Sequence, residues 1–160
     1  MHKRNWLLFA FLSFASYSFV AFADSVDVTF PVEASVFASI QLTVEQNMSF
    51  GQQSVVSVDT DIASTQPAEI LASADADAAV TGSFGSSTVS LVCQSASCSG
   101  SPVIAVDNFT CSGSGFNADC MGVIGSTAEA TININSIMHL EPAHLLGTYT
   151  GTQTFNLAYS

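Results

Sequence analysis

Basic residues are almost absent from this chain of 160 residues. Its only lysine and arginine are Lys3 and Arg4, against 13 aspartates and glutamates, and the net charge is −11. Such a surface repels phosphate and anionic lipid headgroups, so nucleic acid is not expected as a partner. The scarcity of cations also argues against catalytic schemes in which a lysine or arginine binds a phosphate or stabilises an oxyanion.

Motifs of catalysis and metal binding are missing as well. The chain has no G-x-S-x-G elbow, no Gly-rich phosphate loop before a helix, and no C-x-x-C spacing of the kind that holds zinc. His139, Glu141 and His144 form H-x-E-x-x-H, which differs from the H-E-x-x-H of zinc proteases, and Pro142 breaks any helix there. Ligation of a transition metal by these residues in a loop stays an alternative. We expect a protein that is not an enzyme and has no metal site or other cofactor.

The two basic residues open a sequence typical of a secretory signal peptide. They precede an apolar stretch over residues 6–20, and Ala21-Phe22-Ala23 provides small residues at both positions that signal peptidase reads. The stretch is too short and poorly flanked for a good membrane span, and no later segment reaches the required length of about 18 apolar residues. We predict that residues 1–23 are cleaved, with an uncleaved anchor as the alternative. Export to the periplasm, the cell surface or the medium follows, with no membrane span after cleavage.

Cleavage changes both the charge and the expected cysteine chemistry. Without Lys3 and Arg4 the net charge falls from −11 to −13, and all four cysteines remain. An even number of cysteines in an exported chain indicates disulfides, and four cysteines allow three pairings. We favour the pairs that are close in sequence and separated by turn-forming residues, which are Cys93 with Cys98 and Cys111 with Cys120. Each should contribute about 2–3 kcal/mol by constraining the unfolded chain.

Alternation of apolar and polar residues is the strongest pattern in the chain. From Val26 to Val44 every second residue is apolar, which predicts an extended strand with one buried face. Shorter segments with strand-forming residues follow, separated by turn signals about every eight to twelve residues. We predict a single all-β domain over residues 33–160, built as a sandwich of short antiparallel strands. The later strands are expected near residues 48–51, 55–58, 69–72, 80–92, 103–110, 128–134, 137–140 and 149–159.

The run that begins at Val26 is longer than a usual strand of about five or six residues. Pro31 marks a break in it, because proline cannot donate a hydrogen bond to a central ladder. Residues 34–44 suffice for a first strand of the domain, which leaves residues 24–32 spare.

Six short segments together resemble a known family. They are Ile40–Val44 and Met48–Gly51 near the start, and Ala130–Ile134, Met138–Leu140, Gly147–Gly151 and Phe155–Tyr159 near the end. At these spacings the chain resembles secreted bacterial β-sandwich domains of unknown function that are similar to spore coat protein U and to subunits of archaic chaperone–usher pili. The likeness is specific at the two ends and does not extend to the middle, which holds all four cysteines. It implies an Ig-like or pilin-like sandwich and a structural subunit of a surface fibre or coat.

The resemblance also implies partners, namely like subunits and a periplasmic chaperone with an outer-membrane usher. Subunits of such pili exchange strands, so that an N-terminal extension of alternating apolar residues fills a groove in the next subunit. In this chain the candidates for a donor strand are Val26, Val28, Phe30 and Val32. The alternative is that these residues are the first strand of a complete domain.

The C-terminus resembles the pilus subunits in a second way. Those subunits end on an alternating strand with a penultimate aromatic residue, which their chaperone binds by strand pairing. Here the corresponding residues are Phe155, Leu157 and Tyr159. They are candidates for a chaperone-binding edge and also for a strand that faces the core of the domain.

A second hypothesis stays open beside the assembly subunit. The protein would be a monomeric secreted or surface-associated module that binds a glycan or a host protein. Its sandwich would be complete, with the first strand paired inside its own sheet.

Overall fold

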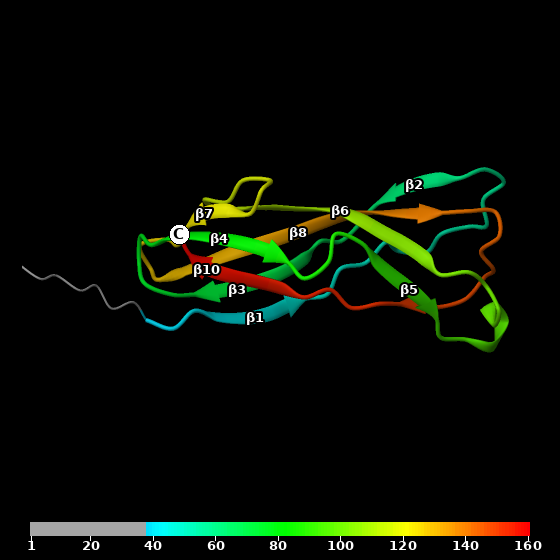
Figure 1. Ribbon diagram of the computed structural model, residues 1–160, viewed down its shortest axis with the longest axis horizontal. Coiled ribbons are helices and arrows are strands. Elements are labelled where there is room, and N and C mark those ends of the chain that lie inside the picture. The colour runs from blue at the N-terminus through cyan, green and yellow to red at the C-terminus, as the bar shows by residue number, and fades with distance from the viewer. Residues whose placement is uncertain (1–37) are drawn as a thin grey trace, which may run out of the picture. The chain divides into compact units, whose positions relative to one another are not determined.

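The computed structural model describes residues 38–160, and nearly all of their regular structure is β (Figure 1). The all-β fold that the sequence predicts is therefore confirmed. One short 3-10 turn spans Ala96–Cys98, and none of the described residues forms a helix long and apolar enough to cross a membrane. The strands are β1 (Gln41–Gln46), β2 (Thr60–Ala63), β3 (Ala68–Ser73), β4 (Ala79–Phe84), β5 (Val89–Cys93), β6 (Ile104–Gly113), β7 (Met121–Val123), β8 (Glu129–Leu140), β9 (Tyr149–Thr150) and β10 (Phe155–Tyr159).

Two parts of the prediction lie outside the described residues. They are the signal peptide, residues 1–23, and the candidate donor strand, residues 24–32 with Val26, Val28, Phe30 and Val32.

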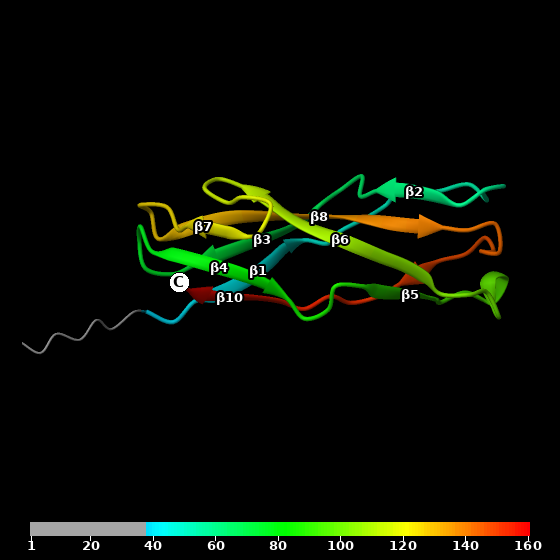
Figure 2. The same cartoon turned by 45° about the horizontal axis from the view of Figure 1, so that its top comes forward.

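The larger sheet is organised around the long strand β8. The first half of β8 pairs with β3 and its second half with β2, while β6 lies along its other edge. β1 extends this sheet beyond β3, and β5 and β9 extend it beyond β6. The smaller sheet has the order β10-β4-β7, and every strand pair in both sheets is antiparallel. The result is a curled, sandwich-like half-barrel, shown in two views that differ by a 45° turn in Figures 1 and 2.

Alternation along β8 explains where the core lies. Even-numbered residues from Ala130 to Leu140 are buried, whereas Thr131 to His139 at the odd positions are only half-buried. The buried residues form two apolar clusters, one around Ile132 and one around Met138. Full burial of a side chain such as that of Ile132 contributes about 1.5–3 kcal/mol.

Both disulfides have the pairing that the spacing of the cysteines predicts. Cys111 and Cys120, with Cα atoms 4.9 Å apart, lie within the first apolar cluster. Cys93 and Cys98, with Cα atoms 5.8 Å apart, close the 3-10 turn. Structural disulfides persist in oxidising compartments, so the two bonds are compatible with an exported protein.

Several predicted strand boundaries differ from the structure. Residues 128–134 and 137–140 belong to one continuous strand, because Ser136 keeps the alternation and its backbone bonds with Ser64. Residues 80–92 and 149–159 are instead each split, where the chain passes from one sheet to the other.

Two predicted strands are wrong. Residues 48–51 form only an isolated bridge, from Ser49 to Gln66, and residues 55–58 form no strand, since the next one is β2. Val55 and Val58 have the strand-forming side chains that suggested it, but they are exposed. A strand needs a paired neighbour, which β-propensity alone does not supply.

Candidate functional site

One side of the sandwich is open. β6 lies inside the larger sheet, where it pairs with both β8 and β5. On the open side the larger sheet ends at β1 and the smaller sheet at β10, and within residues 38–160 no strand pairs with the outer edge of either. A groove with a volume of about 970 Å³ enters the sandwich on this side.

The floor of the groove is apolar, and its walls come from distant parts of the chain. One wall consists of Val44 and residues 47–55, and the other of residues 144–153 with Phe155. The floor belongs to the inner faces of β3, β5, β6 and β8. Its principal side chains are Ile70, Leu91, Val106, Ile134, Met138 and Leu140. Most of each wall is loop, and β1 and β10 each contribute one residue, Val44 and Phe155. The apolar floor matches the side-chain part of strand binding, in which alternate side chains of an extended strand fill pockets.

β1 shows that part of the predicted buried face is uncovered. Ile40 packs against the first apolar cluster, but Leu42 is 38% exposed and Val44 is 62% exposed. Ile40, Leu42 and Val44 alternate as the sequence predicts. The prediction that this face is buried is wrong for Leu42 and Val44. An exposed apolar row on an edge strand is a template for pairing with a further strand.

β10 carries the three C-terminal candidates on one face, as their alternation predicts. Phe155, Leu157 and Tyr159 are half-buried and pack against the first apolar cluster. The hydroxyl of Tyr159 donates to the carbonyl of Ala38, at 2.8 Å, and accepts from the backbone N–H of Asp75, at 3.1 Å. Tyr159 therefore links the end of β10 to the residues before β1.

The outer backbone edge of β10 can be assigned at two of its residues. Gly85 N–H donates to Thr154 O, at 2.8 Å, and Ser160 N–H donates to Ala79 O, at 3.0 Å. The even-numbered residues thus bond toward β4. In an antiparallel ladder the residues between them direct N–H and C=O to the opposite side, so Phe155 and Leu157 present theirs at the outer edge.

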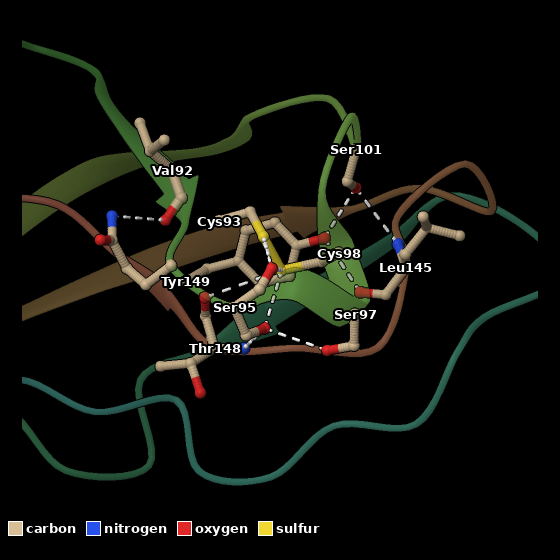
Figure 3. The surroundings of a disulfide bond; sticks show 10 residues. Val92, Cys93, Ser95, Ser97, Cys98, Ser101, Leu145, Thr148 and Tyr149 are labelled. Carbon is tan, nitrogen blue, oxygen red and sulfur yellow. Dashed lines mark hydrogen bonds between the residues drawn. A yellow bond between two sulfur atoms is a disulfide. The ribbon is translucent and has the colours of Figure 1, made fainter.

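The Cys93–Cys98 disulfide supports the wall formed by residues 144–153 (Figure 3). Gln94 N–H donates to Thr148 O, at 2.7 Å, and Thr148 N–H donates to Ser95 Oγ, at 3.2 Å. Gly147 packs so closely that a Cβ atom there would lie 2.3 Å from Cys98 Sγ. Only glycine fits at this position, and no pattern in the sequence pointed to its role.

Tyr149, which belongs to this wall, also holds it in place through its hydroxyl group (Figure 3). Its hydroxyl lies 2.9 Å from Leu145 O and 2.7 Å from Ser101 Oγ. Ser101 Oγ in turn accepts from Leu145 N–H, at 3.2 Å. The wall is therefore a hydrogen-bonded unit, although Leu145 and Leu146 leave 49% and 64% of their surface exposed.

The two histidines of the H-x-E-x-x-H sequence do not converge. His144 is buried, where its Nδ1 accepts from Glu141 N–H, at 2.8 Å, and its Nε2 donates to Val103 O, at 3.1 Å. His139 lies on a half-buried position of β8 and contacts two aspartates. Among residues 38–160, no group of three or more His, Cys, Asp and Glu side chains is placed to hold a metal ion.

The groove is thus the candidate site, and of the three residues proposed from the C-terminal pattern only Phe155 lines it, whereas Leu157 and Tyr159 do not. Comparison with known proteins gives no relative, since no family model, curated protein or solved structure matches this chain.

Proposed function

We propose that this protein is a non-enzymatic structural subunit of a bacterial surface assembly, pilus-like or coat-like, whose groove accepts a β-strand from another copy. The groove supports this most strongly, because its floor is apolar and Val44 of β1 and Phe155 of β10 lie at its border. The alternative, a monomeric binding module for a glycan or a host protein, requires a complete sandwich. The exposed Leu42 and Val44 on β1 favour the first function.

The proposed donor strand is residues 24–32. Val26, Val28, Phe30 and Val32 alternate with other residues, so all four project from one face of an extended strand. Burial of four such side chains would contribute about 6–12 kcal/mol before the costs of ordering and association.

Strand direction limits how a donor could enter the groove of its own chain. β1 and β10 run in opposite directions, as Figures 1 and 2 show. To enter the groove of its own chain, the donor would have to turn back within residues 33–37 and run antiparallel to β1, and therefore parallel to β10. A donor from another copy can run in either direction, and in each case it is antiparallel to one of the two strands and parallel to the other.

Export and assembly fit the same proposal. The predicted signal peptide and the two disulfides agree with a location in the periplasm, at the cell surface or outside the cell. An exposed strand edge, such as that of β10 at Phe155 and Leu157, is an aggregation hazard before assembly. We propose that a periplasmic chaperone covers β10, at Phe155, Leu157 and Tyr159, until an usher or another subunit replaces it.

A synthetic peptide of residues 24–32 should stabilise a chain that consists of residues 33–160. At a peptide concentration about 100 times its Kd, the free energy of unfolding should rise by about 2.7 kcal/mol. For a domain of this size the gain corresponds to a rise in Tm of about 10 °C, measured by circular dichroism. A peptide with Val28→Ser and Phe30→Ser is the control and should leave Tm unchanged. Equal Tm values with both peptides would contradict the proposed function.

A further inference from the structure

A histidine lies between two aspartates on the larger sheet, on the face of β8 opposite the side chains that line the groove. His139 of β8 places Nδ1 2.6 Å from Asp61 Oδ1 of β2 and Nε2 2.8 Å from Asp107 Oδ1 of β6. An ionised carboxylate can only accept hydrogen bonds, so both contacts are satisfied when both ring nitrogens carry hydrogen. That form of the ring is the imidazolium cation.

The surroundings of His139 favour this cation. The hydrogen bond to Asp107, followed by that to Asp61, raises the pKa of His139 above its ordinary value of 6.5, against an opposing effect of burial. Residues 24–160 contain no lysine or arginine, so no neighbouring side chain can replace the charge of His139. The other ionisable groups on β8, on the strands beside it or next to their ends are acidic, namely Asp59, Glu69, Glu129 and Glu141.

The contact with Asp61 anchors a short strand. β2 has four residues and, among the described strands, pairs only with β8, with Asp61 directly opposite His139. β2 follows residues 50–59, of which residues 50–55 line the groove. Phe50 and Val56 pack against the second apolar cluster. Hydrogen bonds within this segment join residues that are close in sequence, such as the bond from Gln53 Nε2 to Phe50 O.

We propose that Asp61, His139 and Asp107 form a pH-responsive clamp that holds β2, and with it the groove wall of residues 50–55, against the sheet. When the ring loses a proton, one of its nitrogens presents a lone pair to a carboxylate oxygen, and an attraction becomes a repulsion. Because the pKa is raised in the folded chain, the stabilisation is complete below about pH 6.5 and is lost as the pH rises through the raised value. The effect on assembly, but not the clamp itself, rests on the proposed function of the groove.

Hydrogen exchange on the whole exported chain tests the clamp. After correction for intrinsic exchange rates, protection of the β2 amides should fall about threefold to fivefold between pH 6 and pH 9, as expected for exposed ion pairs. Protection of the β4 amides should stay constant.

His139→Gln should show the lower β2 protection at both pH values, and Asp107→Asn should reduce the pH response. Asp119→Asn, which removes an equal charge far from the clamp in the sequence, should keep the wild-type response. Unchanged β2 protection across this pH range in the wild-type chain would overturn the clamp.

The fraction of chains in polymer, measured at a fixed protein concentration, distinguishes a failure of the clamp from a failure of the proposed function of the groove. A less ordered groove wall should weaken strand binding. The wild-type chain should therefore form less polymer at pH 9 than at pH 6, and His139→Gln should form the smaller amount at both. If β2 loosens while the polymer fraction of the wild type stays constant, the proposed link to assembly is overturned. If β2 loosens but no polymer forms at either pH, the proposed function of the groove fails and the clamp is supported.

Discussion

Deletion of residues 24–32 should abolish polymer formation and leave the fold of residues 38–160 unchanged. The deleted segment carries the four apolar side chains proposed to fill the groove of another copy, and the sandwich described here is built without it. The double variant Val28→Asp, Phe30→Asp should have the same effect, because burial of an unpaired carboxylate costs several kcal/mol. Light scattering with size-exclusion chromatography measures the polymer, and circular dichroism measures the fold.

A matched control changes the opposite face of the same strand. Asp27→Asn and Thr29→Ser alter residues that alternate with the apolar ones, so this double variant should still polymerise. Polymers that persist after deletion of residues 24–32 would contradict the role of that segment as a donor.

Replacement of Leu157 by proline should weaken binding of the 24–32 peptide about fivefold to a hundredfold compared with replacement by alanine. Both variants lose the leucine side chain, but only proline also removes an N–H that β10 presents at its outer edge. Loss of one hydrogen bond, with an acceptor left unsatisfied, costs about 1–3 kcal/mol, and about 1.4 kcal/mol is a factor of ten in affinity. Fluorescence anisotropy of a labelled peptide measures the difference between the two variants.

Proline is tolerated at an edge strand where its nitrogen points away from the paired neighbour. Leu157→Pro should therefore keep the pairing of β10 with β4, which circular dichroism and hydrogen exchange of β4 can verify. Equal peptide affinities of the proline and alanine variants would show that the outer edge of β10 does not bind the strand.

Alternation in the sequence predicted the inner faces of β8 and β10 because each of these strands has a paired neighbour and lies against the core. The same pattern failed at Leu42 and Val44 of β1, which stay exposed. Alternation shows that a strand has an apolar face, but not whether the chain itself covers that face. The disulfide pairing was predictable because each pair of cysteines is close in sequence.

Features that depend on long-range register were not predictable. Asp61, Asp107 and His139 meet because β2, β8 and β6 pair in one particular register, which no local pattern specifies. Gly147 fits against Cys98 because two loops that are distant in sequence pack together. The groove itself also arises from an open side of the sandwich, and composition alone does not show which strand edges stay unpaired.

The most direct measurement of strand exchange is photo-cross-linking between isotopically distinct copies. A photoreactive benzoylphenylalanine in place of Phe30 is carried by one ¹⁵N-labelled copy, which is mixed with unlabelled chains before irradiation and mass spectrometry. If the groove accepts the strand of another copy, cross-links should join labelled and unlabelled chains at groove residues such as Leu91, Met138 and Phe155. Cross-links confined to single chains, or located away from the groove, would contradict strand exchange between subunits.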